Sequence, residues 1–108
     1  TEFHVNQYLP REQAKPSVFI DDNDVAWVFW RSIGQDGAGT EVYGRRFSVR
    51  NRTCAALSDE FRVNSEIMGN QRDGVCSALP GGKIMAAWIS EKNGVSAVFG
   101  RVLDNNGQ

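Results

Sequence analysis

The sequence has little of the residues on which most catalytic and metal sites depend. It contains one histidine, His4, and two cysteines among its 108 residues. A single imidazole and two separated thiols supply too few ligands for a tightly bound transition metal. They also leave the histidine without a visible partner for a catalytic triad. We therefore expect a protein that is not an enzyme and that has no cofactor, calcium being the one candidate ion.

Strong charge and long apolar runs are missing as well. The formal net charge is -1, whereas non-specific nucleic-acid binding needs a strong positive field. No apolar run approaches the roughly 20 residues of a membrane-spanning helix, and the first residues lack signal-peptide character. With 41% hydrophobic residues the composition is globular. The sequence thus predicts no nucleic-acid partner and no membrane insertion.

What the sequence does contain is an internal repeat. Residues 2–6 (EFHVN) recur as residues 60–64 (EFRVN). The same spacing matches Gln13 with Gln71 and Trp30 with Trp88, and after a two-residue deletion residues 42–45 (VYGR) match 98–101 (VFGR). Two ordered blocks of matches with one gap are hard to obtain by chance. We predict a single two-repeat unit over residues 1–108, with copies at about 2–59 and 60–108.

Each copy is predicted to form four antiparallel strands, and no window keeps a helical period. The third strand, residues 25–30, is apolar on both faces, which is typical of a central, doubly covered strand. Polar and Gly-rich turns separate the strands. The expected strands are residues 2–6, 17–20, 25–30 and 41–48 in the first copy, and 60–64, 75–79, 84–88 and 97–104 in the second.

A repeated four-stranded meander of this length is typical of β-propeller blades. By the alignment, residues 2–6 match the strand that follows residues 41–48. We therefore expect this permuted N-terminal strand to complete the last blade beside residues 98–103. Two blades cannot close a ring. Three arrangements stay open: flanking repeats in a longer array, three self-associating chains that form a six-bladed trimer, or two sheets that cover one another.

Three motifs in the first copy carry a resemblance: Glu-Phe-x-Val-Asn, Gln-Asp-Gly-x-Gly and Val-Tyr-Gly-Arg-Arg-Phe. Together they resemble a tandem repeat of large secreted bacterial surface proteins, including ones with RTX-type calcium-binding repeats, and also sialidase-like and FG-GAP-like blades. The second copy departs from the pattern, with Gly74-Val75-Cys76 in place of Pro-Ser-Val and a shorter Gly-rich hairpin. The resemblance implies an extracellular or cell-surface repeat protein, and it brings no catalytic motif.

We expect a non-enzymatic binding or adhesion module, lectin-like in the sense that blades present aromatic and Arg side chains to sugars. The candidate ligand-binding residues are Trp27, Tyr43 and Arg45, although a core position is the competing interpretation for Trp27. The partner would be a glycan or a cell-surface protein. The alternative is a purely structural repeat, stiffened by calcium. A fragment of a sialidase-like enzyme ranks last, because two blades cannot supply an active-site bowl.

Three further features carry predictions. Asp36 lies in a Gly-rich hairpin, where backbone carbonyls can approach an ion, and it is the candidate calcium ligand. Cys54 and Cys76 are candidates for a disulfide, with a small buried thiol as the competing interpretation of Cys76. Asn51 opens an Asn-Arg-Thr sequon in a polar loop and is the candidate N-glycosylation site.

Overall fold

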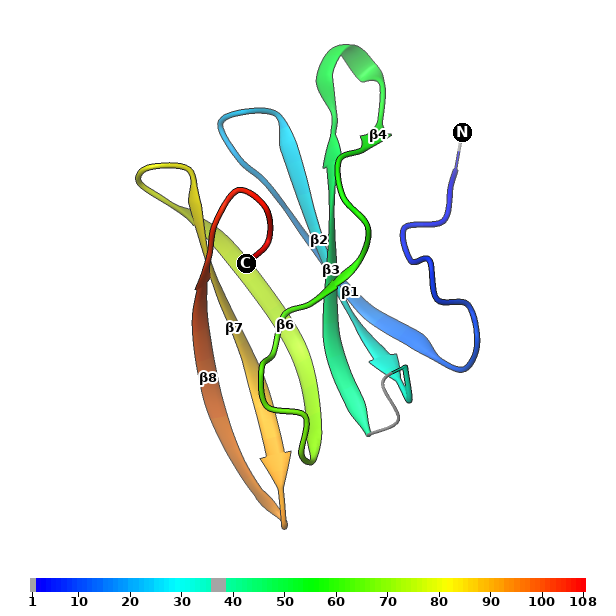
Figure 1. Cartoon of the computed structure of the whole chain (residues 1–108), viewed down its shortest axis with the longest axis vertical. Coiled ribbons are helices and arrows are strands. Elements are labelled where there is room, and N and C mark those ends of the chain that lie inside the picture. The colour runs from blue at the N-terminus through cyan, green and yellow to red at the C-terminus, as the bar shows by residue number, and fades with distance from the viewer. Residues whose placement is uncertain (1, 36–38) are drawn as a thin grey trace.

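The computed structural model describes residues 2–35 and 39–108, and this part of the chain is all-β. Figure 1 shows two antiparallel sheets, with the N-terminal segment at one side of the molecule and β8 at the other. The one helical element among the described residues is a short 3-10 turn, Arg50–Arg52. None of the described helical structure is long and apolar enough to cross a membrane. The expectation of an all-β fold built from antiparallel sheets is confirmed.

The first sheet is a meander of β1 (Gln13–Ile20), β2 (Val25–Ile33) and β3 (Thr40–Ser48). Two short strands, β4 (Ala55–Ala56) and β5 (Phe61–Arg62), both pair with β3. Its central strand β2 is apolar on both faces, and Trp27, Phe29 and Trp30 on it are buried. Because side chains alternate along a strand, this pattern requires cover on both sides of the sheet.

The second sheet is a three-stranded meander of β6 (Asn70–Leu79), β7 (Lys83–Lys92) and β8 (Val95–Leu103). Gly81 and Gly82 take positive φ angles of 81° and 77° in the turn between β6 and β7, a conformation that glycine adopts without strain. Within the described chain, β8 pairs with β7 alone. The β8 edge of this sheet therefore has no neighbouring strand among the described residues.

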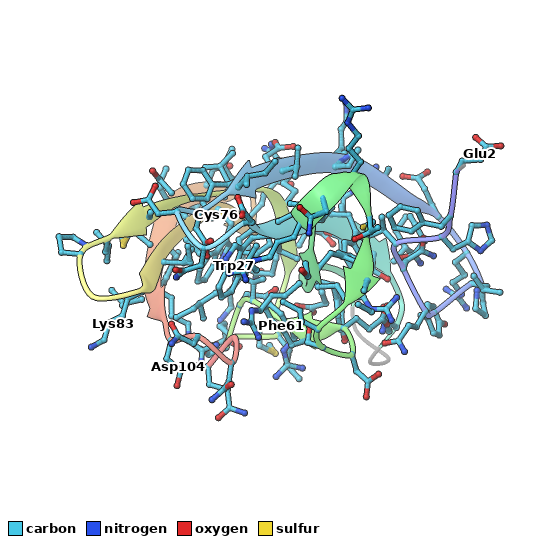
Figure 2. The ribbon with its side chains drawn as sticks, turned by 90° about the horizontal axis from the view of Figure 1, so that it is seen from above. Glu2, Trp27, Phe61, Cys76, Lys83 and Asp104 are labelled. Atoms are coloured by element: carbon cyan, nitrogen blue, oxygen red, sulfur yellow. The ribbon has the colours of Figure 1, made fainter. Side chains whose placement is uncertain are left out.

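The two sheets enclose a common core, with β6 lying against β1, β2 and β3. Figure 2 shows Trp27 in the interior, whereas Glu2 and Lys83 project from the periphery. The core cluster draws residues from both sheets and from the segment after β5: Trp27, Phe29, Val42, Val63, Ile84, Ala86, Trp88 and Leu103. Burial of these large apolar side chains between the layers is the main stabilising term of such a fold.

Both sheets carry the same irregularity in their first strand. The pairing register shifts between Ala14 and Ser17 in β1 and between Arg72 and Val75 in β6. Lys15 and Asp73 occupy these bulges with positive φ angles of 54° and 56°. In β1 the next residue is Pro16, which cannot donate to the ladder and is tolerated at a bulge.

The expectation for the N-terminal strand is wrong in this structure. Residues 2–6 form no strand, and they do not pair with β8 to complete the second sheet. Instead, Arg45 Nη1 donates to the Val5 carbonyl at 3.0 Å, and the Phe3 ring packs on Phe47 at 5.5 Å. These contacts hold the segment on the first sheet, on the opposite side of the molecule from β8 (Figure 1).

The strand expected at residues 60–64 is real but shorter. Only Phe61–Arg62 is a strand, and it pairs with β3 as the sequence predicted. Beyond it the Val63 N–H still donates to the Val42 carbonyl at 2.8 Å. The Val42 N–H, however, donates to Oδ1 of the Asn64 side chain, also at 2.8 Å. An amide side chain thus replaces the next backbone bond and ends the ladder.

Candidate binding site

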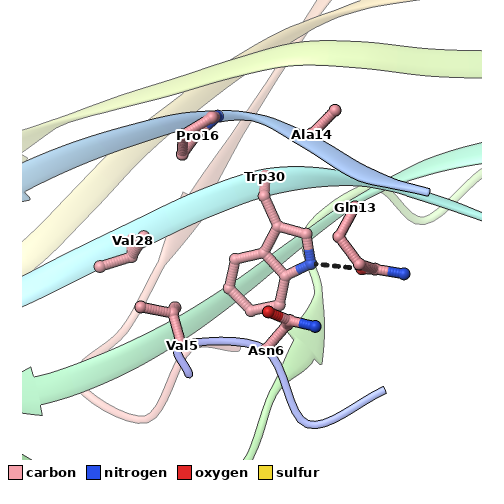
Figure 3. Close-up of a pocket in the computed structure, with 7 residues that line it drawn as sticks. All are labelled: Val5, Asn6, Gln13, Ala14, Pro16, Val28 and Trp30. Carbon is pink, nitrogen blue, oxygen red and sulfur yellow. Dashed lines mark hydrogen bonds between the residues drawn. The ribbon is translucent and has the colours of Figure 1, made fainter. Parts of the chain in front are cut away.

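The N-terminal segment borders a pocket beside Trp30 (Figure 3). Its volume is about 190 Å³. Strands β1 and β2 form its floor and the N-terminal segment forms its rim. The lining residues are Val5, Asn6, Gln13, Ala14, Pro16, Val28 and Trp30. The Trp30 indole N–H donates to Gln13 Oε1 at 3.0 Å, which fixes the ring against the floor.

This pocket is suited to apolar contact and not to proton transfer. None of its lining residues carries an ionisable side chain. Its two amides are already engaged: Gln13 accepts from Trp30, and Asn6 Nδ2 donates to the Tyr8 carbonyl at 2.8 Å. A small apolar group is therefore the chemical class that fits its walls.

A second groove lies beside Trp88, the residue that the sequence repeat matches with Trp30. Its volume is about 240 Å³, and unlike the first pocket its lining includes charged side chains. The Phe99 ring is 48% exposed and stacks on Trp88, with 6.5 Å between ring centroids and 19° between planes. The groove is lined by Ser65, Glu66, Gln71, Trp88, Ser90, Phe99, Gly100 and Arg101. An exposed aromatic face beside hydroxyl, carboxylate and guanidinium groups can receive a sugar ring.

The two tryptophans are held in the same way. Trp88 donates to Gln71 Oε1 at 3.0 Å, as Trp30 does to Gln13. Arg101 Nη1 donates to the Val63 carbonyl at 3.1 Å, as Arg45 does to that of Val5. Sequence reasoning matched these residues but did not assign them to a pocket. The repeat of a Gln and a Trp at matched positions was the sequence signal that could have indicated these two pockets.

Searches against protein-family models, curated proteins and solved structures found no match to this chain.

The structure places the three predicted ligand-binding residues in packing positions. Trp27 is 1% exposed in the core between the sheets, with the Arg46 guanidinium 4.9 Å from its ring centroid. Tyr43 is buried on β3. Arg45 lies 5.2 Å from the Phe47 ring centroid and donates to backbone carbonyls. Tyr43 and Arg45 share β3 with Val42, and none of the three predicted residues lines either pocket described above.

Asp21 has a structural role that turn chemistry explains. Its Oδ1 accepts the N–H groups of Asn23 at 2.8 Å and Val25 at 3.1 Å. Its Oδ2 accepts the Trp27 indole N–H at 3.1 Å. The carboxylate thus closes the β1–β2 hairpin and anchors the buried indole. Both of its oxygens are therefore engaged within this hairpin.

We expect Asp21 to make folding stability depend on pH at the acidic end. Burial alone would raise its pKa, but the hydrogen bonds from Trp27, Asn23 and Val25, with Arg46 nearby, lower its pKa below the ordinary 3.8. A lowered folded-state pKa gives stability that is complete above about pH 4 and lost as pH falls through the folded pKa. Asp21→Asn should therefore flatten the acid limb of a melting-temperature-against-pH curve followed by circular dichroism. Parallel curves for variant and wild type would contradict this role.

Three further predictions concern an ion site, a glycosylation site and a disulfide. Asp36 lies outside the described residues. Among the residues that are described, no group of three or more His, Cys, Asp or Glu side chains could hold a metal. Asn51 is exposed in the Arg50–Arg52 turn with a φ of 53°, so its glycosylation stays a prediction. Cys54 is a free, exposed thiol, and Cys76 is a free, half-buried thiol packed against the core. The structure therefore does not join them.

The two thiols are expected to react at very different rates. Burial raises the pKa of Cys76 to about 11, and the thiolate is the reactive form. Cys54 is exposed. Iodoacetamide at neutral pH should therefore alkylate one thiol quickly, and peptide mapping should locate it at Cys54. A Cys54→Ser control should leave only the slow reaction. Two unreactive cysteines that become reactive after reduction would instead establish the disulfide that the sequence suggested.

Proposed function

We propose that this chain is a non-enzymatic structural repeat module that acts by joining to units of its own kind, in an extracellular or cell-surface protein. One observation carries the proposal. Polar side chains that could have bound a ligand are used in matched pairs instead: in each sheet a glutamine accepts the indole N–H of a tryptophan, and an arginine donates to the segment before the sheet. Gln13 with Trp30 and Arg45 with Val5 are repeated by Gln71 with Trp88 and Arg101 with Val63.

The arrangement of the sheets also supports this role. Two antiparallel meanders packed face to face, with a segment shared between them, resemble neighbouring blades of a β-propeller. Residues 61–64 pair with β3 of the first sheet, while Arg101 of the second sheet bonds to Val63 within them. A module built this way passes structural support from one unit to the next, as repeat proteins do.

Calorimetry tests the structural proposal. If the two sheets form one unit, the chain unfolds in a single transition whose calorimetric and van't Hoff enthalpies agree. Two resolved transitions, one for each sheet, would overturn the proposal, because independent sheets could not transmit support. The same protein should bind none of the glycans on an immobilised panel.

A second candidate function, carbohydrate binding, is favoured by the groove beside Trp88. Here the half-exposed Phe99 ring lies next to Glu66, Ser90 and Arg101, which combine a stacking surface with hydrogen-bonding groups. If this function is correct, the chain binds glycans on the panel and Phe99→Ala weakens binding at least tenfold. Met85→Ala is the matched control, because Met85 is exposed on the opposite face of the same sheet. Glycan binding unaffected by Phe99→Ala would exclude this groove as the site.

A further inference from the structure

The second sheet leaves open an edge and a face whose counterparts in the first sheet are covered. Strand β3 lies between β2 and β5, whereas its repeat counterpart β8 has β7 alone among the described strands. Val98 on β8 is 78% exposed, while its counterpart on β3, Val42, is 0% exposed. Other exposed apolar side chains share that face: Val75, Met85 and Val102. Soluble monomers rarely leave such a patch uncovered.

A segment that could supply the missing strand lies at the opposite side of the molecule. Residues 3–6 (FHVN) match residues 61–64 (FRVN), which pair with β3. Arg45 holds the Val5 carbonyl as Arg101 holds that of Val63. Residues 3–6 therefore lie on the first sheet as residues 61–64 lie on the second. They differ in having no strand on their outer side within the described chain.

We infer that residues 3–6 of one copy of the chain pair with β8 of a second copy, so that copies join head to tail. The inference rests on the proposed structural function and names its partner. The internal junction supplies the register, because each residue of the new junction has a counterpart there. Tyr43 opposite Arg62 becomes Phe99 opposite His4, and Gly44 opposite Phe61 becomes Gly100 opposite Phe3.

The hydrogen bonds transfer in the same way. At the internal junction the Val63 N–H donates to the Val42 carbonyl, and the Val42 N–H donates to Asn64 Oδ1. Between copies, Val5 would donate to Val98, and Val98 would donate to Asn6 Oδ1. Asn6 already has the local geometry of Asn64. Its Nδ2 donates to the carbonyl two residues later at 2.8 Å, and that of Asn64 does so at 2.9 Å.

A glycine provides space for the incoming ring in both places. A Cβ added at Gly44 would lie 3.0 Å from the Phe61 ring and 2.8 Å from that of Phe29. Only glycine therefore lets the Phe61 ring lie over β3. Gly100 stands at the corresponding position of β8, where a Cβ would lie 2.6 Å from Met85 Cε, the end of a flexible side chain that can move aside for Phe3 of the second copy.

The Trp30 pocket fits the exposed face of the second sheet. At the internal junction Val42 covers Gly74 so closely that a Cβ there would lie 2.5 Å from Val42 Cγ1. The counterpart of Gly74 is Pro16, which lines the pocket, and the counterpart of Val42 is the exposed Val98. Val98 of one copy would therefore occupy the Trp30 pocket of the next copy. Pro16 is larger than Gly74, and Ala87 is smaller than its counterpart Phe29, so the changes in volume offset each other.

Sedimentation velocity at tens of micromolar tests the junction directly. A head-to-tail contact gives a closed ring or an open filament. A species of about 36 kDa, three times the 12.0 kDa chain, or a ladder of larger species supports the inference. A 12.0 kDa monomer throughout overturns it.

Two variants make the test specific. Val98→Glu blocks the β8 end and leaves the N-terminal end intact, whereas Asn6→Leu does the reverse. Each alone should associate at least tenfold more weakly than wild type. Mixed in equal amounts, they retain one intact junction and should form a dimer of about 24 kDa, twice the 12.0 kDa chain. Mixtures that stay monomeric while wild type associates would show a different interface and overturn the inference.

Failure of this inference can be told apart from failure of the proposed function. Val98 is largely exposed, so Val98→Glu should melt like a wild-type monomer. Calorimetry of that variant reports whether the two sheets form one unit, independently of any association between copies.

Discussion

Trp88→Ala is expected to lower the free energy of unfolding by about 3 to 5 kcal/mol. The indole is 5% exposed and belongs to the core cluster that joins the two sheets. Its removal leaves a cavity between the layers. It also leaves the fully buried Gln71 amide without the indole N–H that it accepts at 3.0 Å. Urea denaturation followed by far-ultraviolet circular dichroism measures the loss.

Trp30→Ala is the natural comparison, because Gln13 holds Trp30 as Gln71 holds Trp88. Trp30 borders an open pocket, so part of its cavity merges with space that already exists. Its loss should be large but smaller than that of Trp88→Ala. A wild-type-like denaturation midpoint for Trp88→Ala would contradict a core shared by the two sheets.

Asn64→Leu is expected to cost about 3 kcal/mol, because several buried polar groups lose their partner together. Asn64 is 1% exposed. Its Oδ1 accepts from the Val42 N–H, and its Nδ2 donates to Glu41 Oε2 and to the Glu66 carbonyl. Leucine fills similar space but satisfies none of these groups, so the cost is one of unpaired polarity and not of volume.

Asn6→Leu provides a matched control at the counterpart position. The half-buried Asn6 donates to the Tyr8 carbonyl, a local bond two residues away. Its replacement in the dilute chain should cost about 1 kcal/mol or less. Chemical denaturation of both variants at the same low concentration compares them. Equal losses would show that Asn64 does not act as a buried link between β3 and the segment that follows β5.

The strands could be predicted because their sequence patterns are compatible with few other secondary structures. β2 is apolar on both faces, which requires a covered central strand, and the turn at Asp21 has residues that favour only a tight connection. The matching of Trp30 with Trp88 correctly indicated equivalent surroundings, since both indoles are buried and bonded to matched glutamines. Periodicity and turn preference depend on neighbouring residues in the chain, so they can be evaluated without knowledge of the tertiary packing.

The position of residues 2–6 could not be predicted in the same way. Alternation of Phe3 and Val5 with polar residues indicates a strand, but a strand also needs a partner. The pattern does not say that Arg45 and Phe47 hold the segment away from β8. The candidate site had the same difficulty. An aromatic residue such as Trp27 can stack on a sugar ring when it is exposed. In this structure β6 packs against the first sheet, and the Trp27 ring is buried.

The sharing of residues 61–64 between the two sheets has a consequence for synthesis of the chain. A ribosome releases the protein from its N-terminal end, and β1, β2 and β3 leave the exit tunnel before the segment that pairs with β3. Until Asn64 has emerged, β3 exposes an edge to solvent and Val42 lacks its cover. The first sheet is therefore open to proteolysis and to chaperone binding until residues 61–64 have emerged from the tunnel.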